Sequence, residues 1–215
     1  MTQDRQIREA VLAELLWDPS LSATRIEVTA DNGVVTLTGQ VPNYLQKHEA
    51  EKAATRVNGV KAVVQELEVR LNSAFQHSDQ EVARAAVDRL AWDVSVPRDA
   101  IKVEVEKGWV TLTGQVSWHY QRDAAEQAIR SLQGVIGVTN RTTIKAPLNT
   151  STIASDIGVA LHRSWFDPQT ITVTAQGGKV TLTGTVSTPG DRSTAGATAW
   201  AAPGTTDVEN DLIVA

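Results

Sequence analysis

The side chains best suited to chemistry in this chain are few and scattered. Glu66 and Glu68 are two residues apart, which places both on the solvated face of a strand rather than around a substrate. Four histidines are present, and none has a second histidine four residues away, as a metal-binding helix requires: His48, His77, His119 and His162. The patterns Gly-x-x-x-x-Gly-Lys, Gly-x-Gly-x-x-Gly and Gly-x-Ser-x-Gly are also missing. We therefore predict no catalytic residue, no metal ligand and no cofactor.

The composition narrows the class of protein further. The chain has 215 residues, a formal net charge of −5 and no cysteine. Without cysteine there is no disulfide, thiolate zinc site, iron–sulfur cluster or cysteine nucleophile. An acidic chain lacks the basic face that nucleic acids select, so no nucleic-acid partner is expected.

Tryptophan is the residue type most suited to binding. The chain has six tryptophans against two tyrosines and two phenylalanines. Exposed aromatic rings suit a lipid interface or the centre of a protein–protein contact. The candidate lipid or partner contacts all lie in the middle third of the chain: Trp92, Trp109, Trp118 and Tyr120.

The segments that must position these residues recur three times. Thr-Leu-Thr-Gly stands at residues 36–39, 111–114 and 181–184, with offsets of 75 and 70. The same offsets relate glycines after the second predicted helix and many apolar positions. Such repetition predicts three small tandem domains, each with a core of its own: residues 1–72, 73–147 and 148–215.

Each repeat is predicted to fold as helix, strand, strand, helix, strand. In the first repeat, apolar residues four apart mark a helix face, and residues 26–41 alternate with period two around an Asn-Gly turn. Asp4 and Asp79 stand where helix N-caps are expected. The glycine of each Thr-Leu-Thr-Gly stretch is interpreted as a bulge or a point of close packing. The fold class is α+β, with three αββαβ two-layer sandwich domains, each a three-stranded sheet with two helices on one face.

Two kinds of tryptophan can be separated by comparing the repeats. Trp17 and Trp92 occupy equivalent places at the end of a first helix, and Trp165 lies near the corresponding place in the third repeat. We interpret the equivalent pair as caps over small cores. Trp109 and Trp118 have no aromatic counterpart in the other repeats. They give the middle repeat additional aromatic surface, for which packing between neighbouring repeats is the alternative use.

The repeat resembles a known family. Its most recognisable stretch, Gly-x-Val-Thr-Leu-Thr-Gly-x-Val, spans residues 33–41, 108–116 and 178–186. The second helix ends in Gly-Val at residues 59–60 and 134–135. This order of motifs is similar to the BON domain (bacterial OsmY and nodulation), over nearly the whole chain. The third repeat departs most, since Thr205 replaces the valine.

The resemblance implies a non-enzymatic module of the osmotic or envelope stress response that binds phospholipid surfaces peripherally. The alternative is a soluble protein-interaction or chaperone-like module whose repeats bind protein clients. No secretory signal and no stretch long enough for a membrane span is visible in the sequence. We therefore expect a cytoplasmic protein without a transmembrane segment, or a periplasmic one if a signal has been removed. The oligomeric state stays open.

Overall fold

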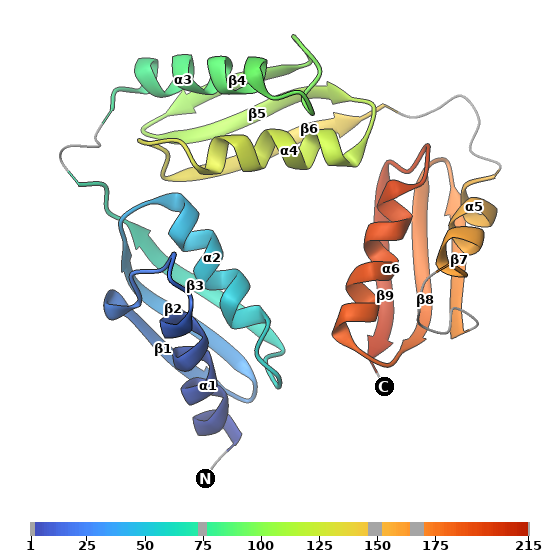
Figure 1. Ribbon diagram of the computed structural model, residues 1–215, viewed down its shortest axis with the longest axis horizontal. Coiled ribbons are helices and arrows are strands. Elements are labelled where there is room, and N and C mark those ends of the chain that lie inside the picture. Colours follow the sequence, from blue (N-terminus) through green and yellow to red (C-terminus); the bar gives the residue numbers. More distant parts are fainter. Residues whose placement is uncertain (1–2, 73–76, 146–151, 164–169, 215) are drawn as a thin grey trace. The chain divides into compact units, whose positions relative to one another are not determined.

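The computed structural model describes residues 3–72, 77–145, 152–163 and 170–214 (Figure 1). These residues form six α-helices, one short 3₁₀ helix and three three-stranded sheets. The predicted α+β class and the predicted order of elements are both confirmed. Trp165 lies outside the described residues.

The three repeats use the same elements in the same order. The first consists of α1 (Gln3–Trp17), η1 (Ala23–Arg25), β1 (Ile26–Asp31), β2 (Val34–Val41), α2 (Tyr44–Thr55) and β3 (Ala62–Val69). The second consists of α3 (Asp79–Trp92), β4 (Ile101–Glu106), β5 (Trp109–Val116), α4 (His119–Arg130) and β6 (Gly137–Ile144). The third consists of α5 (Ile153–Leu161), β7 (Ile171–Gln176), β8 (Lys179–Val186), α6 (Pro189–Ala201) and β9 (Asp207–Val214).

The second strand is the centre of each sheet. In the first sheet, β1 is antiparallel and β3 parallel to β2, and the third sheet has the same pattern. The second sheet has the corresponding order, β4-β5-β6. A parallel pair needs a crossover connection, which α2 supplies between β2 and β3. This topology brings the start of β1 and the end of β3 to the same end of the sheet.

The core of each repeat forms where the helices cover the sheet. In the first repeat α1 packs on β1, α2 packs on β3, and the two helices contact each other. The helical stripe of apolar residues is buried as predicted, and so are alternate residues of β2: Ile7, Val11, Leu15, Val35, Leu37 and Val41. The third repeat buries a separate cluster around Ile157 and Leu182. The first and third repeats therefore each have a core of their own.

The glycine of each Thr-Leu-Thr-Gly stretch is a point of close packing, as predicted. Gly39, Gly114 and Gly184 have φ angles of 120°, 144° and 125°, which side-chain-bearing residues rarely adopt. A Cβ atom at any of the three would overlap the carbonyl oxygen of the residue before the first strand: Arg25, Ala100 and Thr170. The start of the first strand can therefore pack against the central strand only because the central strand has glycine at this position.

The predicted N-caps are wrong, because both aspartates lie inside their helices. The N–H of Ser78 donates to Glu81 Oε2 at 2.8 Å, and the N–H of Glu81 donates to Ser78 Oγ at 3.3 Å. This reciprocal pair is a capping box, so Ser78 is the N-cap of α3 and Asp79 is its first residue. The Ser78 side chain and then its amide lower the pKa of the exposed Glu81 carboxyl.

The two aspartates bind a hairpin turn instead. Asp79 accepts the amides of Lys107 and Gly108 at 2.7 and 2.8 Å, and Asp4 accepts the amide of Gly33 at 3.2 Å. Each carboxylate thus joins the beginning of the first helix to the turn between the first two strands. The opposite end of the helix is consequently carried to the other end of the sheet.

Candidate functional site

An exposed apolar tip ends the first helix of the middle repeat. The 14 residues of α3 extend over about 21 Å from the β4–β5 turn toward the far end of the sheet. Trp92, the last of them, is 86% exposed, and Val94 just beyond is completely exposed at 101%. We call Trp92 and Val94 the α3 tip. One sequence-predicted contact residue is therefore freely accessible.

The interpretation of Trp17 and Trp92 as caps over the cores is wrong. Trp17 is also 86% exposed, and Leu16 beside it is 69% exposed. The cores are instead closed by Leu15 and Leu90, which are buried. Two helical steps of about 100° place each tryptophan on the side of the helix opposite that buried leucine. The helical periodicity of the sequence could have predicted that both tryptophans are exposed.

A short turn fixes the backbone behind each indole. Asp18 Oδ1 accepts the Ser20 hydroxyl at 2.6 Å and the Ser20 amide at 2.9 Å. In the middle repeat, Asp93 Oδ1 accepts the Ser95 amide at 2.9 Å. The Ser20 hydroxyl, followed by the Ser20 amide, lowers the pKa of the Asp18 carboxyl below its usual value. The shared Trp-Asp-x-Ser sequence thus holds both helix ends in one conformation.

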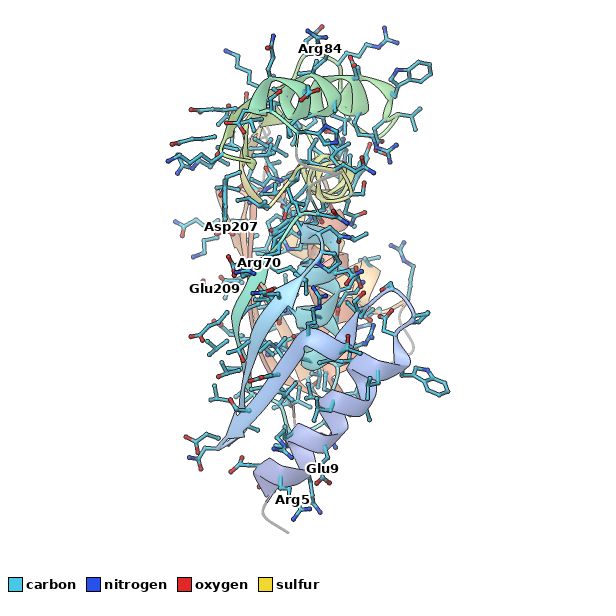
Figure 2. All side chains as sticks on the ribbon, turned by 90° about the vertical axis from the view of Figure 1, so that its left-hand side faces the viewer. Arg5, Glu9, Arg70, Arg84, Asp207 and Glu209 are labelled. Atoms are coloured by element: carbon cyan, nitrogen blue, oxygen red, sulfur yellow. The ribbon has the colours of Figure 1, made fainter. Side chains whose placement is uncertain are left out.

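Three arginines lie on α3 and in the loop that follows it. Arg84 lies on the outer side of α3 (Figure 2), Arg89 is on the last turn, and Arg98 follows in the loop; all three are exposed. Within the described residues, none of them forms an ion pair. The nearby carboxylates of Asp88 and Asp93 make the region mixed rather than strongly basic. The arginines remain available to a partner.

The start of α4 brings two more candidate residues to the same end of the repeat. The amide of Gln115, at the end of β5, donates to the carbonyl of Ala100 at 3.3 Å, in the segment that leads from α3 into β4. Trp118 is half-buried and Tyr120 is 57% exposed. The Gln121 side chain fixes this helix start, since its Oε1 accepts the Trp118 amide at 3.1 Å. Trp92, Trp118 and Tyr120 therefore occupy one end of the domain.

Trp109 lies apart from the other three. It is the first residue of β5, beside the turn that Asp79 binds, and is therefore some 20 Å along the strand from α4. Its indole Nε1 donates to Thr139 Oγ1 at 2.8 Å, and a Cβ at Gly137 would overlap its ring. The ring is 47% exposed on the open face of the sheet. The structure thus groups three of the predicted contact residues and separates the fourth.

One polar position repeats in all three domains, and its role is structural. A side-chain amide on the last strand donates to a backbone carbonyl of the second helix 18 residues earlier, at 2.8, 3.0 and 2.9 Å: Gln65 to Lys47, Asn140 to Arg122 and Asn210 to Arg192. This amide clamp ties helix to strand within each repeat. A repeated side chain whose donor is occupied in this way holds the fold together rather than a substrate.

The part of the chain that the structure describes contains no candidate metal centre and no candidate membrane span. No group of three or more His, Asp or Glu side chains is placed to hold a metal ion there. His119 Nδ1 lies 3.1 Å from Asp123 Oδ2, one helical turn away. Among the same residues, no helix combines the length and the hydropathy needed to cross a bilayer.

These features define a tandem array of small α+β domains, and sequence comparison identifies the family. The BON domain model matches residues 3–70, 78–146 and 149–215. The chain belongs to the BON domain family, and the resemblance seen in its glycine and threonine motifs is confirmed.

Two curated proteins are similar to this chain. Osmotically-inducible protein Y of Escherichia coli (strain K12) is 34% identical over 141 residues, which are 64% of this chain and 70% of that protein. A 21 kDa hemolysin of Actinobacillus pleuropneumoniae is 30% identical over 135 residues, which are 61% of this chain and 69% of that protein.

Among solved structures, the C-terminal domain of CdsD, a structural protein of the Type III secretion system of Chlamydia trachomatis, matches over 100% of both chains. The sequence identity is 17% and the TM-score is 0.28. A superposition at that TM-score carries no functional conclusion.

Proposed function

We propose that this chain is a non-enzymatic protein of the osmotic stress response that binds phospholipid surfaces peripherally through its middle repeat. Membership of the BON family and similarity to a protein named for osmotic induction support the association with stress. The α3 tip supports the lipid contact. Trp92 is the single most informative residue, because an indole that is 86% exposed and backed by a fixed turn suits the membrane–water interface.

The α3 tip combines the two interactions that peripheral binding needs. Trp92 and Val94 supply apolar surface that leaves water when it enters the headgroup region. Arg89 and Arg98 lie close to them in sequence and supply guanidinium groups that can bind lipid phosphates bidentately. Because aspartates are interspersed with these arginines, binding is expected to be weak and sensitive to salt.

The other candidate residues divide between this contact and the rest of the repeat. Trp118 and Tyr120 lie at the same end of the domain as Trp92 and extend the proposed contact. Trp109 lies at the other end and donates its indole N–H to Thr139. The proposed contact therefore includes the first two residues and leaves Trp109 out.

The roles of the repeated polar groups support the proposal that the protein is not an enzyme. The amide clamp and the turn-binding aspartates are each satisfied by backbone groups of their own repeat. A catalytic centre that accompanied the repeat would need polar groups that remain free to reach a substrate.

Vesicle co-sedimentation of the full chain tests the proposal. Vesicles of phosphatidylglycerol with phosphatidylcholine should pellet the protein at low salt, whereas phosphatidylcholine alone should pellet much less. Trp92→Ser should reduce the pelleted fraction, and the equally exposed Trp17→Ser is the matched control. No pelleting on anionic vesicles at low salt would overturn the lipid proposal and favour the protein-client alternative, which a pull-down with the same two variants would then examine.

The cytoplasmic location expected from the sequence stays a prediction. Fractionation of cells that express the untagged natural gene measures it directly. Recovery with the soluble cytoplasmic fraction would support it, and release with the periplasmic fraction would contradict it.

A further inference from the structure

The first repeat has a polar hollow at one end of its sheet that the lipid contact does not use. Its volume is about 530 Å³. Most of the residues that line it carry hydrogen-bonding side chains: Ser22, Thr24, Arg25, Gln40, Arg70 and Asn72. A hollow with two guanidinium groups and no carboxylate in its lining is suited to an anion.

The sheet topology brings the two arginines to this place. Arg25 comes directly before β1 and Arg70 directly after β3. Since β1 is antiparallel and β3 parallel to β2, both arginines flank the end of β2: Arg25 comes just before the pair Ile26–Gly39, and Arg70 just after the pair Val41–Val69. Two strand spacings and an offset of two residues separate their backbones by about 12 Å, a span that two arginine side chains bridge. Figure 2 shows Arg70 on the ribbon of the first repeat.

The backbone of both arginines is fixed. The carbonyl of Arg25 packs against Gly39, where no Cβ fits. The amide of Arg70 donates to the carbonyl of Val41 at 2.8 Å. A pair of cations on a fixed backbone loses less freedom on binding an anion than a pair on a loose loop does.

Neither arginine is committed to a strong internal partner. Within the described residues, Arg25 has no ion pair. Arg70 Nε lies 3.5 Å from Glu68 Oε2, and both side chains are more than half exposed, at 64% and 63%. Such a surface pair contributes little, so an anion with better geometry can replace Glu68. Glu27, two positions after Arg25 on the open face, is expected to weaken the binding of an anion.

The fold itself does not require this pair. At the equivalent positions the middle repeat has Ala100 and Lys145, and the third has Thr170 in place of Arg25. The same strand ends therefore form without two arginines. A ligand, rather than the scaffold, explains them best.

We propose that the hollow of the first repeat binds a phosphate group. The guanidinium groups of Arg25 and Arg70 hold its oxygens bidentately, and the hydroxyls of Ser22 and Thr24 donate to the remaining lone pairs. The ligand class is a small phosphate monoester or diester, which is met as a free anion or as a lipid headgroup. This site lies in a different repeat from the α3 tip, so the two proposals stand or fall separately.

The test is a titration of the isotope-labelled full chain, followed by amide and arginine side-chain NMR signals at constant ionic strength. The probes are inorganic phosphate and monomeric dihexanoyl-phosphatidylglycerol, with chloride as the reference anion. Saturating shifts are expected at Arg25, Gln40 and Arg70. The double variant Arg25→Gln with Arg70→Gln should weaken binding at least about tenfold, because two charge-assisted contacts are lost. Lys145→Gln in the middle repeat is the matched control.

Each outcome decides the proposal. Saturation by both probes, lost only in the double variant, supports a general phosphate site; saturation by the lipid probe alone supports the same site with a headgroup as its ligand. If neither probe gives saturating shifts, or if the double variant binds as tightly as the wild type, the phosphate-site proposal is overturned. Amide spectra of the variants report that the fold is intact, and Trp92→Ser should leave the titration unchanged.

Discussion

The ends of α1 and α3 present the same indole beside different charged residues. Trp17 and Trp92 are equally exposed, and the same Asp-x-Ser turn follows each. The charges before them differ: α1 has Glu9 and Glu14 where α3 has Arg84 and Arg89. The two glutamates of α1 are bound within the first repeat, Glu9 to Arg5 at 2.9 Å (Figure 2) and Glu14 to Arg56 at 3.1 Å.

The comparison separates scaffold from surface. The helix, the turn and the exposed ring recur because the repeat recurs, so an exposed tryptophan alone does not distinguish the two domains. The arginines do distinguish them, because among the described residues α3 has exposed guanidinium groups without ion pairs where α1 has glutamates that are bound by Arg5 and Arg56. The first repeat carries its exposed arginine pair elsewhere, at the end of the sheet.

The largest expected effect concerns the shared scaffold. Gly39→Ala and Gly114→Ala should each destabilise their own repeat by more than about 3 kcal/mol, because the new Cβ overlaps a backbone carbonyl at a positive φ. Thermal unfolding and hydrogen exchange measure the loss. Gly158→Ala in α5 is the control, since its Cβ meets no atom within 4 Å, and it should stabilise by about 0.5–1 kcal/mol. Unequal losses at Gly39 and Gly114 would show that the two scaffolds differ.

The next effect concerns the two indoles. Trp92→Ser should weaken binding to anionic vesicles by about 2 kcal/mol, roughly thirtyfold, because some 100 Å² of apolar surface is no longer buried. Trp17→Ser should change vesicle affinity less than about twofold, since its helix carries glutamates. Both variants should unfold within about 0.5 kcal/mol of the wild type, because both rings lie in solvent. Equal losses of affinity would erase the distinction between the two tips.

A smaller effect is expected from one charge of the α3 tip. Arg89→Gln should weaken binding to anionic vesicles by about 1 kcal/mol, or roughly fivefold, and the difference should shrink as salt is added. Arg141→Gln, on the open face of the middle sheet, is the control with the same change of net charge. If both variants lose affinity equally, net charge rather than the α3 tip governs binding.

The smallest effect is a titration at the α1 end. Ser20→Ala should raise the pKa of Asp18 toward its usual value, because it removes the hydroxyl that chiefly lowers it. The lowered pKa means that stability present above the usual value is lost as the pH falls through the folded value. Carboxyl NMR titration measures the pKa of Asp18 in the wild type and in the variant. The pKa of Glu81, which Ser78 lowers, should stay where it is and serves as the internal control.

The sequence predicted features that depend on local spacing. The three copies, the hairpin turns and the close-packed glycines follow from offsets of 75 and 70 and from alternation within short windows. The exposure of Trp92 was equally local, since it lies two positions from buried Leu90, but the cap interpretation overlooked the helical angle. Repetition of a residue indicates a repeated environment and does not say whether that environment is buried.

Contacts between residues far apart in the sequence could not be predicted. Asp79 binds amides that lie 28 and 29 residues away. From the sequence alone, the same carboxylate suits a local N-cap equally well. Arg25 and Arg70 are 45 positions apart and meet only because β3 lies parallel to β2. The separation of Trp109 from Trp118 likewise reflects the length of β5, which composition does not reveal.

Exposed carboxylates on the edge strands β3 and β9 affect how copies of the protein interact at high concentration. Each described three-stranded sheet leaves its outer strands without a neighbour on one side, and such edges invite joining between copies. The exposed residues of β9 include Asp207, Glu209 and Asp211, and those of β3 include Glu66 and Glu68. Two such edges brought together would oppose like charges along their length. The carboxylates of β3 and β9 thereby disfavour the joining of copies through these two edges at high protein concentration.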